Sequence, residues 1–200
     1  FRMIQIFHFS LKQKSEFECA VKKACTFLKK NKIIVIPTDT CYGLATLVKK
    51  SNIQKLLKIK KRSAKKPISI FVPSFAFVKK IAKISSQQEQ FIKNKIATSK
   101  PYTFVVKLKP QFQKEYQLIA PIGKIGIRIV KFPFVKKIVQ KLKEPITATS
   151  ANLADLKSCY SLTEFLNQFQ NQKNLPDLFF DAGKLPFKKP SCCLLYTSDA

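Results

Sequence analysis

The sequence predicts an α/β fold with a mixed parallel and antiparallel sheet. Short apolar runs, typical of buried strands, alternate with longer segments in which apolar residues recur every three or four positions. Several connections between neighbouring strand candidates are too short for the crossover that two parallel strands need, which favours a mixed sheet. A length of 200 residues and an apolar fraction of 46% suffice for one domain with a proper core.

The expected elements follow one another along most of the chain. Strands are expected over residues 3–9, 33–36, 68–72, 102–108, 124–130, 145–149 and 178–180. Helices are expected over residues 15–30, 51–60, 75–84, 87–96, 134–142 and 162–169. Ser15 and Ser51 are the expected N-caps of the first two helices, because a serine hydroxyl can accept a hydrogen bond from the first turn.

The domain is expected to span residues 3–191, with Met3 as a natural start. Residues 184–191 form a proline- and lysine-rich loop. Two interpretations of the tail, residues 192–200, stay open: a final strand, or foreign sequence joined to a truncated chain. We therefore set this tail apart from the domain.

The net charge of +27 allows two interpretations. A surface this basic favours a polyanionic partner, and contact with tRNA or double-stranded RNA is one of them. The other is compositional drift, since the chain is rich in Lys, Ile, Phe and Asn, as an AT-rich genome would produce. The lysines are scattered along the whole length, so the charge alone decides neither way.

Several classes of protein are disfavoured. No apolar run approaches the roughly 20 residues that span a bilayer, and the N-terminal segment alternates too strictly for a secretory signal. We therefore expect a cytoplasmic protein without a membrane partner, with its six cysteines reduced. The cysteines form no CxxC pair and His8 is the sole histidine, so no metal-ligating residues are assigned. Cys41 stays open as a nucleophile, although no histidine lies near it in sequence.

Two stretches more than a hundred residues apart carry the candidate site. Residues 37–44 (PTDTCYGL) and 147–152 (TATSAN) each place small polar side chains at the end of an apolar run. Strand ends are where α/β sheets usually hold ligands. The set suits a nucleotide phosphate and a small polar substrate, bound without a glycine-rich cradle. Its members are Thr38, Thr40, Tyr42, Lys60, Arg62, Ser150 and Asn152.

Arginine is rare in this chain, which makes its positions informative. Only Arg2, Arg62 and Arg128 occur, whereas lysine supplies nearly every other cation. In a chain that otherwise uses lysine, an arginine indicates a position where a planar guanidinium forms two hydrogen bonds to one carboxylate or phosphate. Chance placement of so few residues is the alternative.

The motifs together resemble one known family. The segments are PTDTCYGL (37–44), KKRSAKKP (60–67), PYTF (101–104), GIR (126–128) and TATSAN (147–152), with a weaker match at LFFDAG (178–183). In order and spacing they are similar to the threonylcarbamoyl-AMP synthase family. The resemblance implies the YrdC-like fold: a single-domain twisted mixed sheet flanked by helices, with a broad concave basic surface.

The resemblance also implies an activity. Members of the family are nucleotidyltransferases that condense L-threonine, bicarbonate and ATP into threonylcarbamoyl-AMP and pyrophosphate. A downstream threonylcarbamoyl-transferase complex then modifies an adenosine of tRNA. Mg²⁺ would neutralise the triphosphate of ATP.

The family's site residues carry over onto matching positions of this chain. The K-x-R and S-x-N motifs imply four catalytic residues that also bind ATP: Lys60, Arg62, Ser150 and Asn152. Ser158 is implied to contact the nucleotide phosphates. Three residues are implied to bind threonine: Thr38, Arg128 for the carboxylate, and Ser191.

Departures from the family pattern keep alternatives open. The chain has Ala154 and Asp155 where Ser-Gly is frequent, Val130 where a proline is usual, and the sequence CCLL at 192–195 before its end. A YciO-type RNA-binding paralogue without this activity is the main alternative, supported by the charge and the PYTF strand. The carbamoyl-transferring module of hydrogenase maturation is disfavoured, because that module usually sits in a much longer, zinc-bearing chain.

Overall fold

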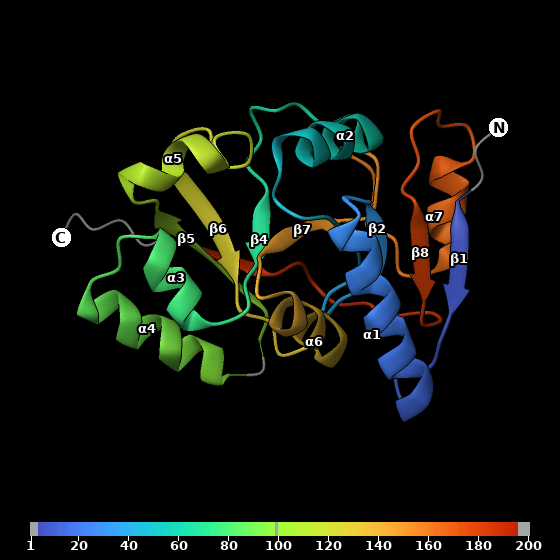
Figure 1. The fold of residues 1–200 in the computed structure, drawn as a ribbon, viewed down its shortest axis with the longest axis horizontal. Coiled ribbons are helices and arrows are strands. Elements are labelled where there is room, and N and C mark those ends of the chain that lie inside the picture. Colours follow the sequence, from blue (N-terminus) through green and yellow to red (C-terminus); the bar gives the residue numbers. More distant parts are fainter. Residues whose placement is uncertain (1–3, 99, 196–200) are drawn as a thin grey trace.

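The computed structural model describes residues 4–98 and 100–195, which form one mixed sheet flanked by helices (Figure 1). The strand order is β1-β8-β2-β3-β7-β4-β6-β5-β9. The strands are β1 (Gln5–His8), β2 (Ile34–Pro37), β3 (Tyr42–Ala45), β4 (Ser69–Phe71), β5 (Tyr102–Lys107), β6 (Lys124–Arg128), β7 (Ile146–Ser150), β8 (Leu178–Asp181) and β9 (Cys192–Leu195). The helices are α1 (Lys14–Lys29), α2 (Lys50–Lys60), α3 (Phe75–Ile81), α4 (Ser86–Ala97), α5 (Pro110–Tyr116), α6 (Pro133–Leu142) and α7 (Leu162–Phe169).

The sheet combines parallel and antiparallel pairs, as predicted. β2 and β3 pair antiparallel, as do β3 and β7, β4 and β7, and β5 and β6. β1 and β8, β2 and β8, β4 and β6, and β5 and β9 pair parallel. The α/β class with a mixed sheet is therefore confirmed.

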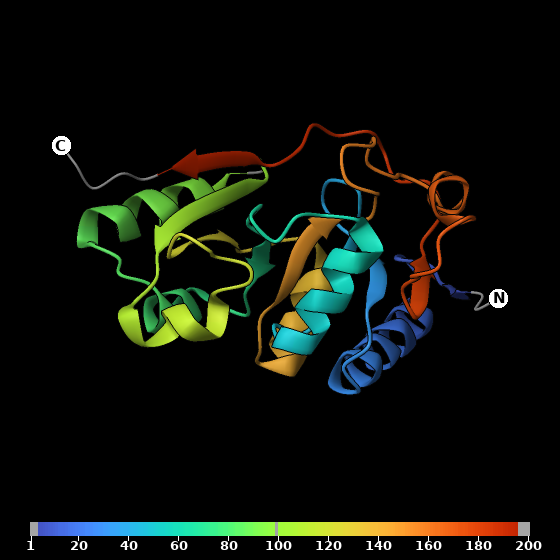
Figure 2. The same ribbon diagram turned by 90° about the horizontal axis from the view of Figure 1, so that it is seen from above.

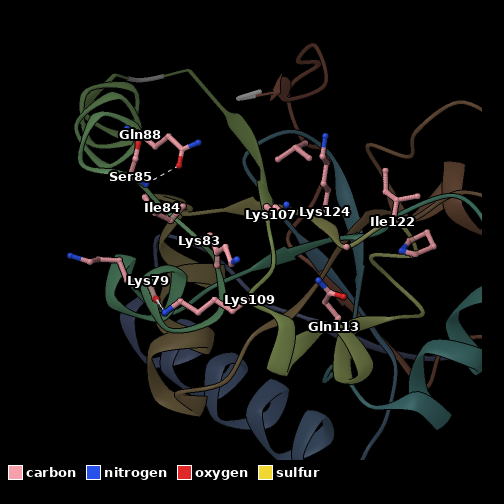
Figure 3. A pocket seen from close by; sticks show the side chains of 14 residues that line it. Lys79, Lys83, Ile84, Ser85, Gln88, Lys107, Lys109, Gln113, Ile122 and Lys124 are labelled. Atoms are coloured by element: carbon pink, nitrogen blue, oxygen red, sulfur yellow. Dashed lines mark hydrogen bonds between the residues drawn. The ribbon is translucent and has the colours of Figure 1, made fainter. Parts of the chain in front are cut away.

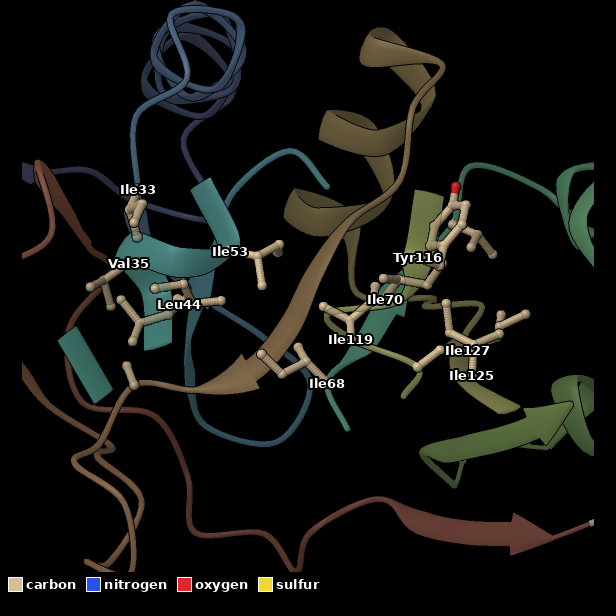
Figure 4. Close-up of a cluster of buried hydrophobic side chains, with 14 of the residues drawn as sticks. Ile33, Val35, Leu44, Ile53, Ile68, Ile70, Tyr116, Ile119, Ile125 and Ile127 are labelled. Atoms are coloured by element: carbon tan, nitrogen blue, oxygen red, sulfur yellow. The ribbon is translucent and has the colours of Figure 1, made fainter. Parts of the chain in front are cut away.

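Each face of the sheet packs against its own set of helices. Because side chains alternate along a strand, Ile34 and Ile36 of β2 face one way and Val35 the other. Ile34 and Ile36 join a core cluster with α1 and α6. Val35 joins the other cluster, with α2, α3, α4, α5 and α7. Figure 4 shows part of this second cluster, including Ile70 and Ile127, which pair in register between β4 and β6. The face that carries Ile34 and Ile36 and packs against α1 and α6 is called the α1/α6 face below.

Two elements were not predicted. β3 lies within residues 37–44, where no strand was expected; it forms a hairpin with β2 in which Pro37 pairs with Tyr42. The run from Tyr42 to Ala45 is buried on both faces, so it lacks the alternation that marks a half-exposed strand. α5 is short and mostly polar, with Pro110 at its first turn, where proline is tolerated.

The two predicted serine caps are wrong. α1 and α2 each begin one residue before the expected serine, at Lys14 and Lys50, and neither helix has a side-chain cap. Ser15 and Ser51 therefore lie inside the first turn.

The start of the tail forms the last strand. β9 runs parallel to β5, with Cys192 opposite Tyr102 and Leu195 opposite Val105. Figure 2 shows the segment that leads from β8 across the molecule to this edge. The domain boundary at residue 191 stays a prediction. Residues 196–200 and the predicted strand start at Met3 lie outside the described residues.

None of the helices in the described ranges combines the length and the apolar character that crossing a membrane requires.

Candidate functional site

Strand register gathers residues of several strands on the α1/α6 face. Ser150 pairs with Gly43, and Arg128 pairs with Phe71. Ser69 lies two residues from Phe71 on β4 and therefore points to the same side. These residues line a cavity of about 250 Å³ to which neither α1 nor α6 contributes. The cavity thus occupies a part of this sheet face that those two helices leave open.

The cavity brings together five of the eight site residues that the family resemblance implies. These are Thr38, Arg128, Ser150, Ser158 and Ser191, which come from the β2–β3 turn, β6, β7 and two loops.

The other three residues that the resemblance implies, Lys60, Arg62 and Asn152, do not line the cavity. Of the two remaining members of the candidate set, Thr40 lines it and Tyr42 does not. Lys60 and Asn152 contact the end of β7 behind Ser150. Arg62 lies close enough to Lys60 for its charge to lower the pKa of that lysine.

The hydroxyl of Thr38 organises the β2–β3 turn. Its Oγ1 donates a hydrogen bond to the carbonyl oxygen of Cys41 at 2.7 Å and accepts one from the backbone N–H of Thr40 at 3.2 Å. The backbone N–H of Cys41 also donates to it at 3.3 Å. The turn is therefore held from inside by the side chain that was predicted to contact threonine.

Arg128 is fixed at the cavity wall by two neighbours. Its Nη2 donates to Oδ1 of Asp39 at 2.6 Å, and its guanidinium lies over the ring of Phe71, 4.9 Å from the centroid. Arg128 is 8% exposed, so its charge is largely shielded from water. A pre-oriented guanidinium beside hydroxyl groups suits a carboxylate ligand, because part of its donor set remains unused by Asp39.

Lys60 ties the end of α2 to the end of β7. The side chain is 1% exposed. Its Nζ donates to the carbonyl oxygen of Asn152 at 2.7 Å and to Oδ1 of Asn152 at 3.2 Å, and also to the carbonyl oxygen of Ser150. Burial, and then the charge of Arg62, lower the pKa of Lys60 to about 8. The ammonium is therefore occupied by the protein's own oxygens.

Asn152 completes this lock. Its Oδ1 accepts from the hydroxyl of Ser150, while its Nδ2 donates to the carbonyl oxygens of Leu153 at 2.8 Å and Leu156 at 2.6 Å. Lys60 and Asn152 thus position Ser150, which itself faces the cavity.

Arg62 keeps donor capacity. Its Nη2 donates to the carbonyl oxygen of Pro67 at 2.9 Å, and its buried Nε has no hydrogen-bond partner among the described residues. Burial lowers the pKa of Arg62 from its ordinary value. A buried unpaired donor costs free energy unless a ligand or water satisfies it.

Several lining residues were missed by sequence reasoning. Thr103 of β5 shares a hydrogen bond of 2.8 Å with Ser191, which joins the last loop to the sheet. Tyr160 donates its hydroxyl to the carbonyl oxygen of Lys188 and packs on the ring of Phe187. The PYTF motif contains Thr103, but no sequence pattern connects Tyr160 with the loop it supports.

The chemistry of a cysteine nucleophile is disfavoured. Burial raises the pKa of Cys41, which keeps the thiol protonated. The sole histidine, His8, pairs with Asp181 at the far edge of the sheet, Nδ1 to Oδ2 3.0 Å. All six cysteines lie in the described ranges and are unpaired. Among the described residues, no group of three or more His, Cys, Asp or Glu is arranged to hold a metal ion.

The family comparison decides the identity of the fold. The Sua5, YciO and YrdC family model, described as "Telomere recombination", matches residues 26–199. This chain belongs to the Sua5/YciO/YrdC family.

Relatives in this family carry the name threonylcarbamoyl-AMP synthase. The human protein of that name is 28% identical over 177 residues, covering 88% of this chain and 60% of the human one. The Pasteurella multocida protein is 30% identical over 144 residues, covering 71% and 78%. A Methanocaldococcus jannaschii protein, provisionally given the same name, is 30% identical over 183 residues, covering 89% and 83%. The chain is thus related to enzymes of this kind.

Solved structures of the Sua5/YciO/YrdC family share the fold. P. abyssi Sua5 complexed with L-threonine superposes with a TM-score of 0.80 at 19% identity, covering 99% of this chain and 55% of Sua5. E. coli YciO superposes with a TM-score of 0.78 at 21% identity, covering 100% and 92%. HypF in a phosphate- and nucleotide-bound form has a TM-score of 0.77, but this chain spans only 28% of it. The single-domain, YrdC-like architecture is therefore confirmed.

Proposed function

We propose that this chain is an L-threonylcarbamoyladenylate synthase, a nucleotidyltransferase that acts in the cytoplasm. It would condense L-threonine, bicarbonate and ATP to threonylcarbamoyl-AMP and pyrophosphate. The observation that carries the proposal is the cavity in which Arg128 is held beside a set of hydroxyl groups. The names of the relatives at 28–30% identity support the same activity.

Arg128 is proposed to receive the threonine carboxylate. Asp39 and Phe71 fix the guanidinium, which limits the conformational entropy lost when a ligand binds. Ser191 and Thr103 offer hydroxyl groups across the same cavity for the polar side of the amino acid. P. abyssi Sua5, which shares this fold, forms a complex with L-threonine, and that supports this class of ligand.

The reaction is proposed to proceed through N-carboxythreonine, in which the amine nitrogen of threonine bonds to the carbon of bicarbonate and water is released. An oxygen of its new carboxylate attacks the α-phosphorus of ATP, and the bond from that phosphorus to the bridging oxygen of pyrophosphate breaks. The protein would contribute position and charge rather than a covalent intermediate. Ser150, Ser158 and Arg62 are proposed to contact the nucleotide, while Lys60 and Asn152 hold Ser150 in place.

The residues that line the candidate cavity do not provide the ligands of a resident Mg²⁺ ion. Among the described residues, no carboxylate lines the cavity, and Asp39 near its edge is committed to Arg128. Magnesium prefers oxygen ligands and is often bound through substrate phosphates instead. The proposed steps therefore rest on the chain's own cations and hydroxyl groups.

Two further parts of the proposal concern partners. The product would pass to a downstream complex that transfers the threonylcarbamoyl group to tRNA. The alternative is a YciO-type RNA-binding paralogue without synthase activity, and the observation behind it is that E. coli YciO shares the fold over the whole chain with a TM-score of 0.78. The two functions differ in whether pyrophosphate is made.

Pyrophosphate release from ATP tests the proposal. We expect release by the purified chain only when L-threonine and bicarbonate are both present. Arg128→Gln should raise KM for threonine by at least about tenfold with little change in KM for ATP, because a charge-assisted pair with a carboxylate is lost. A folded chain that releases no pyrophosphate, or releases it without threonine, would contradict the proposal.

A further inference from the structure

A second cavity, further along two of the strands that line the candidate site, is framed by lysines. It measures about 1030 Å³, against about 250 Å³ for the candidate site. Its walls are the α3–α4 connection, the end of β5, the start of β6 and the loop before it (Figure 3). We call it the lysine groove and define it by Lys83, Lys107, Lys124, Ile84 and Ile122.

Strand register measures its distance from the candidate site. Lys107 pairs with Lys124 on β5 and β6, and Val105 pairs with Gly126. Thr103 and Arg128, which line the candidate site, lie two further residues along each strand. From Lys107 to Thr103 the strand rises by about 13 Å, whereas Val105 of the groove wall lies about 7 Å from Thr103, so the two cavities are neighbouring sites on the same pair of strands.

Three of the groove's lysines are uncommitted. Lys83, Lys107 and Lys124 are exposed, and among the described residues none of their ammonium groups has an ion-pair or hydrogen-bond partner. The other two lysines of the wall are already used: Lys79 pairs with Glu89 at 3.0 Å, and Lys109 donates to the carbonyl oxygen of Lys79.

Ser85 and Gln88, also in the wall, are satisfied by each other. They bond each other's backbone N–H groups in a capping box at the start of α4. The groove therefore offers a partner mainly three free positive charges.

Aliphatic side chains accompany these charges. Ile122 is 77% exposed, so it presents a large apolar side chain to a partner at the edge of the groove. Ile84 and Val105 are half-buried in the same wall. The described lining contains no aromatic residue and no arginine, the side chains that stack on bases of single-stranded nucleic acid. The groove thus presents unpaired ammonium groups beside exposed aliphatic side chains. A partner segment that carries carboxylates beside aliphatic side chains would complement it in both respects.

We propose that the lysine groove docks an acidic segment of a partner protein that also carries aliphatic side chains. Ile122 would be buried against that segment, while Lys83, Lys107 and Lys124 pair with its carboxylates. Such a site would lie beside the candidate site without contributing to it, and the inference does not depend on the proposed synthase activity.

A fluorescent peptide of about twelve residues tests the inference by anisotropy on the whole chain. The probe alternates Glu with Leu and Ile; the reference probe replaces each Leu and Ile by Ser at the same charge. The alternating probe should bind more tightly. Combining Lys83→Gln, Lys107→Gln and Lys124→Gln should weaken its binding by about tenfold, and Ile122→Ser by about fivefold.

A matched variant separates the groove from net charge. Lys55→Gln, Lys58→Gln and Lys173→Gln remove the same charge from another basic cavity and should change binding by less than twofold. Equal losses in both triple variants, or equal binding of both probes, would overturn the proposal. Loss of tRNA binding in the groove triple variant, with no effect of Ile122→Ser on the peptide, would assign the groove to nucleic acid instead. Pyrophosphate release should be unchanged in all these variants, so failure here is distinguishable from failure of the synthase proposal.

Discussion

Arg62 has a buried Nε without a hydrogen-bond partner among the described residues, and it lies close to Lys60. Its substitution is therefore the most direct single-residue test of the proposed ATP-binding role. Arg62→Ala should lower kcat/KM for pyrophosphate release by at least about a hundredfold, the cost typical of removing one preorganised donor from a developing charge. The fold should survive, because within the described residues the side chain donates only to the carbonyl oxygen of Pro67. The readout is steady-state kinetics together with a urea unfolding midpoint.

Lys65→Ala is the control for Arg62. Lys65 is an exposed cation in the same loop and does not line the candidate cavity. A normal rate in Arg62→Ala, or an equal loss in Lys65→Ala, would remove Arg62 from the site.

Lys60 predicts a specific pH dependence of stability. Its pKa is about 8 in the fold against 10.5 ordinarily, so burying its charge opposes folding below pH 8. Between pH 8 and 10.5 the unfolded chain keeps this proton and the folded chain releases it. The free energy of unfolding contributed by Lys60 therefore rises with pH across that window, by about 3 kcal/mol in all.

Lys60→Met isolates that contribution. Urea unfolding at about pH 7.5, 9 and 10.5 should show the wild type gaining stability relative to the variant as the pH rises. Parallel profiles for the two proteins would show that Lys60 does not titrate in this range.

The residues of the site show what sequence motifs can and cannot give. The motifs identified Thr38, Arg128, Ser150, Ser158 and Ser191, which the fold gathers around one cavity. They did not reveal how those residues are held. The Arg128–Asp39 pair joins residues 89 positions apart and the Lys60 lock joins residues about 90 apart, and such contacts follow from strand register rather than from local pattern.

At the level of strands, Gly126 of β6 lies where the side chains of Ser69 on β4 and Thr103 on β5 leave little room for a Cβ atom. A Cβ at this position would lie 2.3 Å from Oγ of Ser69 and 3.1 Å from Cγ2 of Thr103. Gly126→Ala should lower the free energy of unfolding by about 1–3 kcal/mol, because the side chains of Ser69 and Thr103 must move to make room for the new methyl group. It should also narrow the cavity that Ser69 and Thr103 line.

Ser69→Ala provides the rescue for Gly126→Ala. Removing Oγ eliminates the closest contact, so the double variant should recover part of the lost stability in urea unfolding. An additive loss in the double variant would mean that the two side chains do not compete for the same space.

The sequence pattern located some elements well and missed others. The boundaries of α7 were predicted without error, since its apolar residues recur every three or four positions and its other residues are polar. β3 is buried on both faces and α5 spans only seven residues, so neither carries a clear periodic signal. The predicted helix over residues 75–84 ends earlier, at Ile81, because Ala82 pairs with Leu108 as an isolated bridge.

For the molecule as a whole, the +27 charge poses a choice between functional contact and compositional drift. If the lysines bind tRNA, the affinity should fall by at least about tenfold between roughly 50 and 200 mM salt, since each phosphate contact releases counterions. Filter binding with a tRNA transcript measures this slope. A flat salt dependence would assign the lysines to drift.

The fold class could be predicted because most strands and helices carried a clear pattern and alternated along the chain. The strand order could not, since it depends on which non-neighbouring strands meet, such as β8 inserted between β1 and β2. The candidate site could still be predicted without the strand order, because the motifs contain polar residues at strand ends and the sheet brings several of these ends together.

The chemical identity of the product decides whether this cavity joins threonine, bicarbonate and ATP. Mass spectrometry of the nucleotide product, after incubation of the chain with ATP, L-threonine and ¹³C-bicarbonate, identifies it. We expect threonylcarbamoyl-AMP that carries the label, formed in equal amount with pyrophosphate and lost in Arg62→Ala. Folded chain that consumes no ATP, or an AMP product without labelled carbon, would refute the synthase proposal.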